Sequence, residues 1–105
     1  MTFELFQELM SLDICIEILF FVNGNKKFDF CWMGKMPDEK TKQADFWYGL
    51  TPDDKNEYDY PTFQDFSSAK VFDGKSLSEI WGSIVIKEIN GCDPIEILSH
   101  ICRNM

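Results

Sequence analysis

Hydrophobic residues recur at two different spacings along this chain, and each spacing predicts one kind of secondary structure. Near the N-terminus, Phe3, Phe6 and Met10 follow helical spacing, so we expect a short helix that Thr2 caps and that runs through Met10. Residues 14–22 instead alternate at every second position, which is typical of a strand. The face of this strand that we expect to meet the core holds Ile14, Ile16, Ile18, Phe20 and Val22.

The same alternation predicts two more strands after the first. Residues 23–25, Asn-Gly-Asn, are a strong hairpin signal because Asn-Gly readily adopts the backbone angles of a tight turn. The chain would return over 26–33, and a third strand would span 44–50. Because sequential strands usually pair, we expect an antiparallel meander. The second strand would carry on one face Phe28, Phe30 and Trp32.

Capping residues predict the helices of the C-terminal half. Thr62 gives a weak capping signal for one or two turns, and residues 76–79 (Ser-Leu-Ser-Glu) match a capping box that opens a short helix. A fourth strand is predicted over 83–89. Asp93, followed by Pro94 at the first helical position, opens a last helix. The apolar stripe of this last helix would hold Ile95, Leu98, Ile101 and Cys102.

These elements predict a single α+β domain over residues 1–105. An antiparallel sheet of about four strands would carry the N-terminal helix, the short middle helices and the C-terminal helix packed on it. The composition agrees with one core, because 45% of the residues are hydrophobic and 15% are aromatic in a chain of 105.

The charge balance and the hydrophobic runs argue against several partners and locations. Eighteen acids against ten bases give a net charge of −8, which disfavours nucleic acid because its phosphates would repel the protein. The longest apolar run, 14–22, contains Glu17 and is far shorter than the roughly 20 residues of a membrane helix. The N-terminus carries acids where a secretion signal carries bases, so we expect a cytoplasmic protein that binds no membrane. Reduced cysteines at positions 15, 31, 92 and 102 would then serve as small core residues.

The sequence offers little support for catalysis or for a cofactor. His100 is the single histidine and no two cysteines have C-x-x-C spacing, so we expect no metal site. Residues 73–76 (Asp-Gly-Lys-Ser) look like the end of a phosphate-binding loop but lack its earlier glycine, and we interpret them as a turn and a helix cap. We therefore predict no catalytic, cofactor-binding or metal-binding residue. The weakest of our hypotheses is a small enzyme that uses carboxylates alone, such as Asp45 with Glu57.

The acidic stretch over 51–61 is the segment most suggestive of function, and we expect it to be a loop. It lacks the glycine and the register of a calcium-binding loop, and a solvated acidic loop is its plainest interpretation. The alternative is a negative patch that binds a basic protein, because tyrosines beside acids suit protein interfaces. Because side chains alternate along a strand, Trp47 points to the other face from Phe46 and Tyr48. It would lie either in a second core layer or in this patch. The candidate partner-binding residues are Asp53, Asp54, Glu57, Tyr58, Asp59, Tyr60 and, as an anchor, Trp47.

Part of the C-terminal half is similar to known bacterial sequences. Residues 71–81, with the Ile-Val-Ile of 84–86 and the Ile-Asn-Gly of 89–91, resemble the C-terminal part of small bacterial single-domain proteins of unknown function. The resemblance covers about a third of the chain and implies no activity, cofactor or site residue. As a small acidic α+β protein, the chain is also similar in class to bacterial immunity proteins, which neutralise toxins by binding them.

The leading hypothesis is therefore a non-enzymatic module that binds a basic protein partner through an acidic and aromatic surface. An immunity or antitoxin role is one form of it, and charge complementarity would make the association fast and salt-sensitive. The second hypothesis is a homo-oligomeric structural module, such as a homodimer, that pairs through a sheet edge or an aromatic face.

Overall fold

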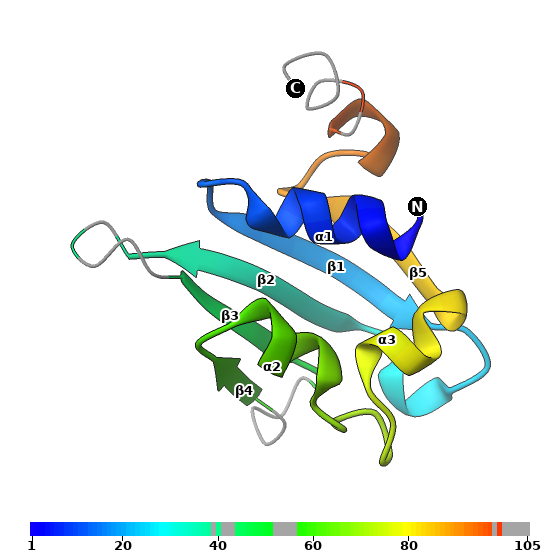
Figure 1. Ribbon diagram of the computed structural model, residues 1–105. Coiled ribbons are helices and arrows are strands. Elements are labelled where there is room, and N and C mark those ends of the chain that lie inside the picture. The colour runs from blue at the N-terminus through cyan, green and yellow to red at the C-terminus, as the bar shows by residue number, and fades with distance from the viewer. Residues whose placement is uncertain (39, 41–43, 52–56, 98, 100–105) are drawn as a thin grey trace.

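The computed structural model has the predicted α+β architecture, and it describes residues 1–38, 40, 44–51, 57–97 and 99 (Figure 1). Five antiparallel strands form one sheet in the order β4-β3-β2-β1-β5. The strands are β1 (Ile16–Val22), β2 (Cys31–Pro37), β3 (Ala44–Gly49), β4 (Glu57–Tyr60) and β5 (Ile84–Ile89). The helices are α1 (Phe3–Ser11), α2 (Phe63–Ser68), α3 (Leu77–Ile80) and the 3₁₀ turns η1 (Lys26–Phe28) and η2 (Trp81–Ser83).

The three α-helices lie on one side of the sheet, and their first turns are capped as predicted (Figure 1). The side chains of Thr2 and Thr62 each accept the backbone N–H three residues further on, at 3.1 and 3.0 Å. Ser76 and Glu79 form the complete capping box at the start of α3. These local interactions fix where the helices begin, so the helix positions follow closely from the sequence.

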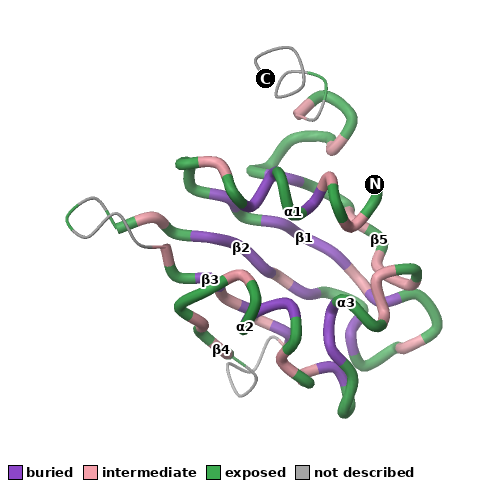
Figure 2. Tube along the Cα trace, in the orientation of Figure 1, coloured by how far each residue is buried: buried purple, intermediate pink, exposed green. Residues whose placement is uncertain are grey.

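The core lies between these helices and the inner face of the sheet, where buried positions run along β1 and β2 (Figure 2). At its centre the rings of Tyr48 and Phe66 stack with centroids 4.1 Å apart, and the Tyr48 hydroxyl donates to the Phe66 carbonyl at 2.7 Å. Burial raises the pKa of Tyr48 above its usual range, so its hydroxyl stays protonated. The predicted inner residues of β1 are buried as expected, except that Ile14 lies before the strand and is exposed.

The sheet has five strands rather than about four, because β4 forms where the sequence predicts a loop. β4 pairs with β3 and sets Tyr58 opposite Tyr48 and Tyr60 opposite Phe46. The segment Glu-Tyr-Asp-Tyr does alternate, with its tyrosines packed against the core and its two acids exposed. Because acids are dense around this short segment, its sequence favours a solvated loop more strongly than its alternation favours a strand.

The connection between β1 and β2 is longer than predicted, and this shifts the second strand. The sequence predicts a strand over 26–33, but η1 occupies the start of that range and β2 begins at Cys31. The predicted aromatic face is divided as a result: Phe28 is buried in the core, whereas Phe30 is half exposed and Trp32 is partly exposed. The Asn-Gly signal therefore predicted the antiparallel pairing of β1 and β2 correctly, but it did not predict the length of the connection between them.

The predicted turn after β5 also ties this strand to β1. Asn90 and Gly91 have positive φ angles of 52° and 77°, which asparagine and glycine tolerate best. The Asn90 side chain accepts the Glu17 N–H at 2.8 Å and donates to the Cys15 carbonyl at 3.2 Å. This turn therefore fixes the start of β1, including the position of Glu17.

The described part of the C-terminal helix, residues 94–97, packs less than predicted. Asp93 caps it by accepting the Ile95 N–H at 2.9 Å, and Ile97 packs against the core. Ile95, however, is 75% exposed, because this helix extends beyond the sheet on the far side of α1 (Figure 1). The rest of the predicted stripe, Leu98, Ile101 and Cys102, lies outside the described residues, as does His100.

The cysteines only partly follow the prediction of small core residues. Cys31 is fully buried, and its thiol donates to the Leu50 carbonyl at 3.3 Å. Cys15 and Cys92 are free thiols as expected, but both are exposed, because Cys15 precedes β1 and Cys92 follows the turn after β5. The prediction was therefore wrong for these two positions.

At pH 8.5, iodoacetamide is expected to alkylate Cys15 and Cys92 in the native protein and to leave Cys31 unmodified. Burial, with a smaller contribution from the Asp29 charge, raises the pKa of the Cys31 thiol from 9.0 to about 12, and only the thiolate reacts. The folded state thus holds this proton more tightly. The protonated Cys31 thiol therefore stabilises the folded state below pH 9, and this stabilisation is lost as the pH rises toward 12. Peptide mass spectrometry with and without urea measures the labelling, and equal native labelling of Cys31 and Cys15 would contradict the prediction.

Candidate partner-binding face

Because the α-helices pack on one side of the sheet, its other side, here called the open face, is not covered by them. Register assigns side chains to this face, since residues directly opposite in neighbouring strands share a side. Trp32 of β2 is opposite Leu19 and Gly49, and Gly34 is opposite Glu17 and Trp47. The open face therefore carries two tryptophans on adjacent central strands.

Gly34 allows the Trp47 ring to lie against the sheet. A Cβ atom at position 34 would sit 2.7 Å from the Trp47 ring and would also collide with the Ile16 carbonyl oxygen. No other residue type offers the space that this ring occupies. Gly49, on the same face of β3, is different, because its nearest neighbour would be the Trp32 Cβ at 3.8 Å, an ordinary contact.

The two tryptophans border a shallow cleft of about 360 Å³ on the open face, here called the tryptophan cleft. Phe30, 50% exposed, meets Trp32 edge to face with ring centroids 6.0 Å apart. Two carboxylates complete the rim of the cleft. It is lined by Glu17, Phe30, Trp32, Trp47, Gly49, Thr51 and Glu57.

The charge of the open face is strongly negative. Among the residues of the five strands, one lysine faces this side: Lys87, whose ammonium lies 5.3 Å from the centre of the Phe21 ring. The carboxylates that the strand register places there are all exposed, and they belong to Glu17, Asp45, Glu57, Asp59 and Glu88. Aromatic rings among uncompensated carboxylates attract cations and repel anions.

The structure brings together only part of the predicted binding set. Trp47, Glu57 and Asp59 share the open face, with Asp59 directly opposite Trp47 and Glu57 opposite Gly49. Tyr58 and Tyr60 point to the other side and pack against the core. These two tyrosines therefore do not share a face with Trp47, Glu57 and Asp59, because a strand sends alternate side chains to opposite faces. Asp53 and Asp54 lie outside the described residues.

Three residues of the cleft, Glu17, Phe30 and Trp32, were missed by the sequence analysis. Glu17 was visible as the one charged residue of the strand over 14–22, on its predicted outer face. The aromatic pair was assigned to a strand that would begin at Lys26 and carry Phe28 on the same face. In the structure Phe28 is buried from η1, whereas the register of β2 puts Trp32 on the open face with Phe30 beside it. The sequence signal nearest to them is Phe-x-Trp directly after the polar residues Lys26, Lys27 and Asp29, which is unusual for a strand buried on both faces.

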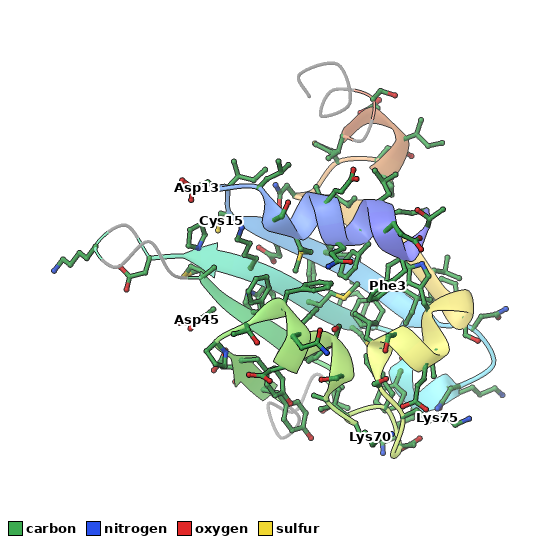
Figure 3. All side chains as sticks on the ribbon, viewed as in Figure 1. Phe3, Asp13, Cys15, Asp45, Lys70 and Lys75 are labelled. Carbon is green, nitrogen blue, oxygen red and sulfur yellow. The ribbon has the colours of Figure 1, made fainter. Side chains whose placement is uncertain are left out.

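The proposed carboxylate pair of an enzyme, Asp45 and Glu57, is not brought together. Asp45 lies near the start of β3 (Figure 3), whereas Glu57 is opposite Gly49 at the end of that strand. Four residues of strand separate the two positions, which is about 13 Å. A pair of carboxyl groups that act on one bond lies closer, at roughly 5–10 Å.

Other kinds of site receive no support from the described residues. They contain no group of three or more His, Cys, Asp or Glu side chains that could hold a metal ion. None of the helices within the described ranges has the length and apolarity to cross a membrane. A scan against protein-family models and searches of curated proteins and of solved structures gave no match to this chain. Among the described residues, the open face is therefore the surface from which a function can be inferred.

Proposed function

We propose that this is a cytoplasmic binding module without chemistry of its own, and that its open face binds a basic protein. The observation that supports the proposal best is the tryptophan cleft, in which two partly exposed indoles lie between Glu17 and Glu57. Neutralising a toxin or another basic effector, as immunity proteins and antitoxins do, is one form that this function takes.

The chemistry of the cleft favours an arginine or lysine side chain as the bound group. Tryptophan is the strongest cation–π partner among the side chains, and carboxylates at the rim add charge-assisted hydrogen bonds. Tryptophan and arginine are also enriched among residues that dominate binding energy at protein interfaces. Nucleic acid is disfavoured for the opposite reason, because its phosphates would meet the carboxylates of Glu17, Glu57 and Asp59.

Neutralising the acids around the cleft is expected to weaken partner binding about tenfold or more. In the variant Glu17→Gln/Glu57→Gln/Asp59→Asn, the indoles remain but the cation loses its counter-charges. Proteins captured from a lysate of the source organism by the wild-type protein would be identified, purified and titrated by calorimetry at about 50 and 300 mM salt. We expect a basic partner whose affinity falls with salt for the wild type and changes less for the variant.

The matched control removes the same charge from the helix-covered side. Glu4→Gln/Glu8→Gln/Asp65→Asn alters three exposed acids on α1 and α2 and is expected to retain the partner. If both triple variants lose partner affinity equally, the loss comes from the change in net charge and not from the acids of the cleft. Capture of the same protein by the cleft variant with unchanged affinity would contradict the proposal.

Self-association is a second candidate, and the position of β4 favours it. This strand forms one edge of the sheet in the described structure, and sheet edges are where two chains pair by adding a strand. Light scattering over a hundredfold dilution distinguishes the two functions. A dimer that resists dilution supports self-association, and a monomer that binds a basic protein supports the proposal above.

A further inference from the structure

On the inner, helix-covered face of the sheet, a lysine occupies a position where the neighbouring residues of the same strand are apolar. The inward-facing residues of β2 are Cys31, Met33, Lys35 and Pro37, and Lys35 is only 6% exposed. Moving an ammonium group out of water is costly, so a buried lysine needs partners. Burial lowers the pKa of Lys35, while the charge of Asp13, in the connection between α1 and β1 (Figure 3), partly opposes this.

The described partners of Lys35 do not use all its donors. Its Nζ donates to the carbonyl oxygen of Leu12, the C-cap residue directly after α1, where a positive charge is favourable. An ammonium group has three N–H donors, and this is the one hydrogen bond that the described residues give it. Asp13 forms no ion pair with it within 4.0 Å, since the pairs among the described residues are Lys27–Asp73 and Lys70–Glu79.

Lys35 lines a cavity of about 350 Å³ between α1 and α2, here called the inner groove. This is the size of a small-molecule site. Met10, Phe46 and Phe63 contribute apolar side chains to its lining, and Gln7 adds an amide from α1. The Ser11 hydroxyl also lines it but already donates to the Glu8 carbonyl at 2.6 Å. The full lining is Gln7, Met10, Ser11, Lys35, Ala44, Phe46 and Phe63.

We propose that the inner groove binds a small apolar carboxylate. The carboxylate would accept hydrogen bonds from the remaining Lys35 donors and from the Gln7 amide, and its hydrocarbon part would pack on Met10, Phe46 and Phe63. One buried cation at the end of an apolar cavity selects an anion with a hydrocarbon body over a neutral or cationic molecule of the same shape. This site is on the opposite side of the sheet from the tryptophan cleft and does not depend on the function proposed for that cleft.

The test compares octanoate with octanol as probes, using calorimetry and two-dimensional NMR on the full chain at pH 7. Octanoate is expected to bind saturably, about tenfold more tightly than octanol, and to shift the resonances of Ala44 and the Met10 methyl group. Lys35→Met keeps the shape of the side chain, and it is expected to lose the preference for octanoate and to bind both probes equally. Lys75→Met, at the opposite end of the molecule from Asp13 (Figure 3), is expected to bind octanoate as the wild type does.

A second variant keeps the inference testable if Lys35→Met does not fold. Ala44→Trp adds a large side chain to the lining of the groove and leaves Lys35 in place, so both probes are expected to lose binding. Equal affinity of the wild type for octanoate and octanol, no saturable binding of octanoate, or unchanged octanoate affinity in Ala44→Trp would each overturn the inference. Shifts confined to Trp32 and Trp47 would do so as well, because they would place the probe on the open face.

Discussion

Gly34→Ala is expected to destabilise the protein by about 3 kcal/mol, near the upper end of what overpacking costs in a protein core. The new methyl group would collide with the Ile16 carbonyl oxygen, which belongs to the backbone of β1 and cannot move aside alone. It would also stand 2.7 Å from the Trp47 ring and displace it from the tryptophan cleft. Urea unfolding at 25 °C measures the free energy, and the melting temperature is expected to fall by roughly 15 °C.

Gly49→Ala is the matched control for this substitution. Gly49 lies on the same open face, on the neighbouring strand, and its added Cβ would make only an ordinary contact with Trp32. We expect a change within about 0.5 kcal/mol, because alanine also loses less backbone entropy than glycine on folding. Similar stabilities of the two variants would show that the Trp47 ring does not need the space above Gly34.

Phe66→Ala is expected to lower the free energy of unfolding by about 4 kcal/mol, the usual loss for a fully buried phenylalanine. Phe66 is completely buried, and its ring stacks on Tyr48 at 4.1 Å while also contacting Phe46. The remaining cavity would lie where α2 packs on β3, so the loss includes both ring contacts and the packing of that helix. Chemical denaturation monitored by far-ultraviolet circular dichroism gives the value.

The same substitution at Phe30 provides the comparison. Phe30 is 50% exposed at the rim of the tryptophan cleft, and Phe30→Ala is expected to cost less than about 1 kcal/mol in stability. It is expected to weaken binding of the basic partner, because the ring that supports Trp32 edge to face is gone. A large loss of stability at Phe30 with a small one at Phe66 would reverse our assignment of core and open face.

The proposed binding face and the proposed groove both follow from one feature of the fold. In the described part of the chain, α1, α2 and α3 lie on one side of the five-stranded sheet, and the aromatic and acidic residues of the open face are accessible on the other. The helices α1 and α2 also leave the inner groove between them, with Lys35 beneath. A basic protein on one face and a small carboxylate on the other would let the concentration of the small molecule influence the stability of the module.

The amino-acid sequence by itself determined the local elements, because their signals involve residues only a few positions apart. The caps at Thr2, Thr62 and Ser76 and the turn at Asn90 lie where they were predicted, since each depends on hydrogen bonds within one turn of chain. The inner face of β1 and the α+β class were also predicted correctly, because period and element order carry that information.

Only the tertiary structure decided which aromatic residues are exposed and which acids lie together. The register of β2 against β1 sets Trp32 opposite Leu19 and so puts it on the open face, and the pairing of β4 with β3 puts Asp59 opposite Trp47 while turning Tyr58 inward. Such assignments depend on strand register, and a shift of one residue exchanges the two faces of a strand. Register is set by contacts between segments far apart in the chain, so no local pattern in the sequence could specify the tryptophan cleft.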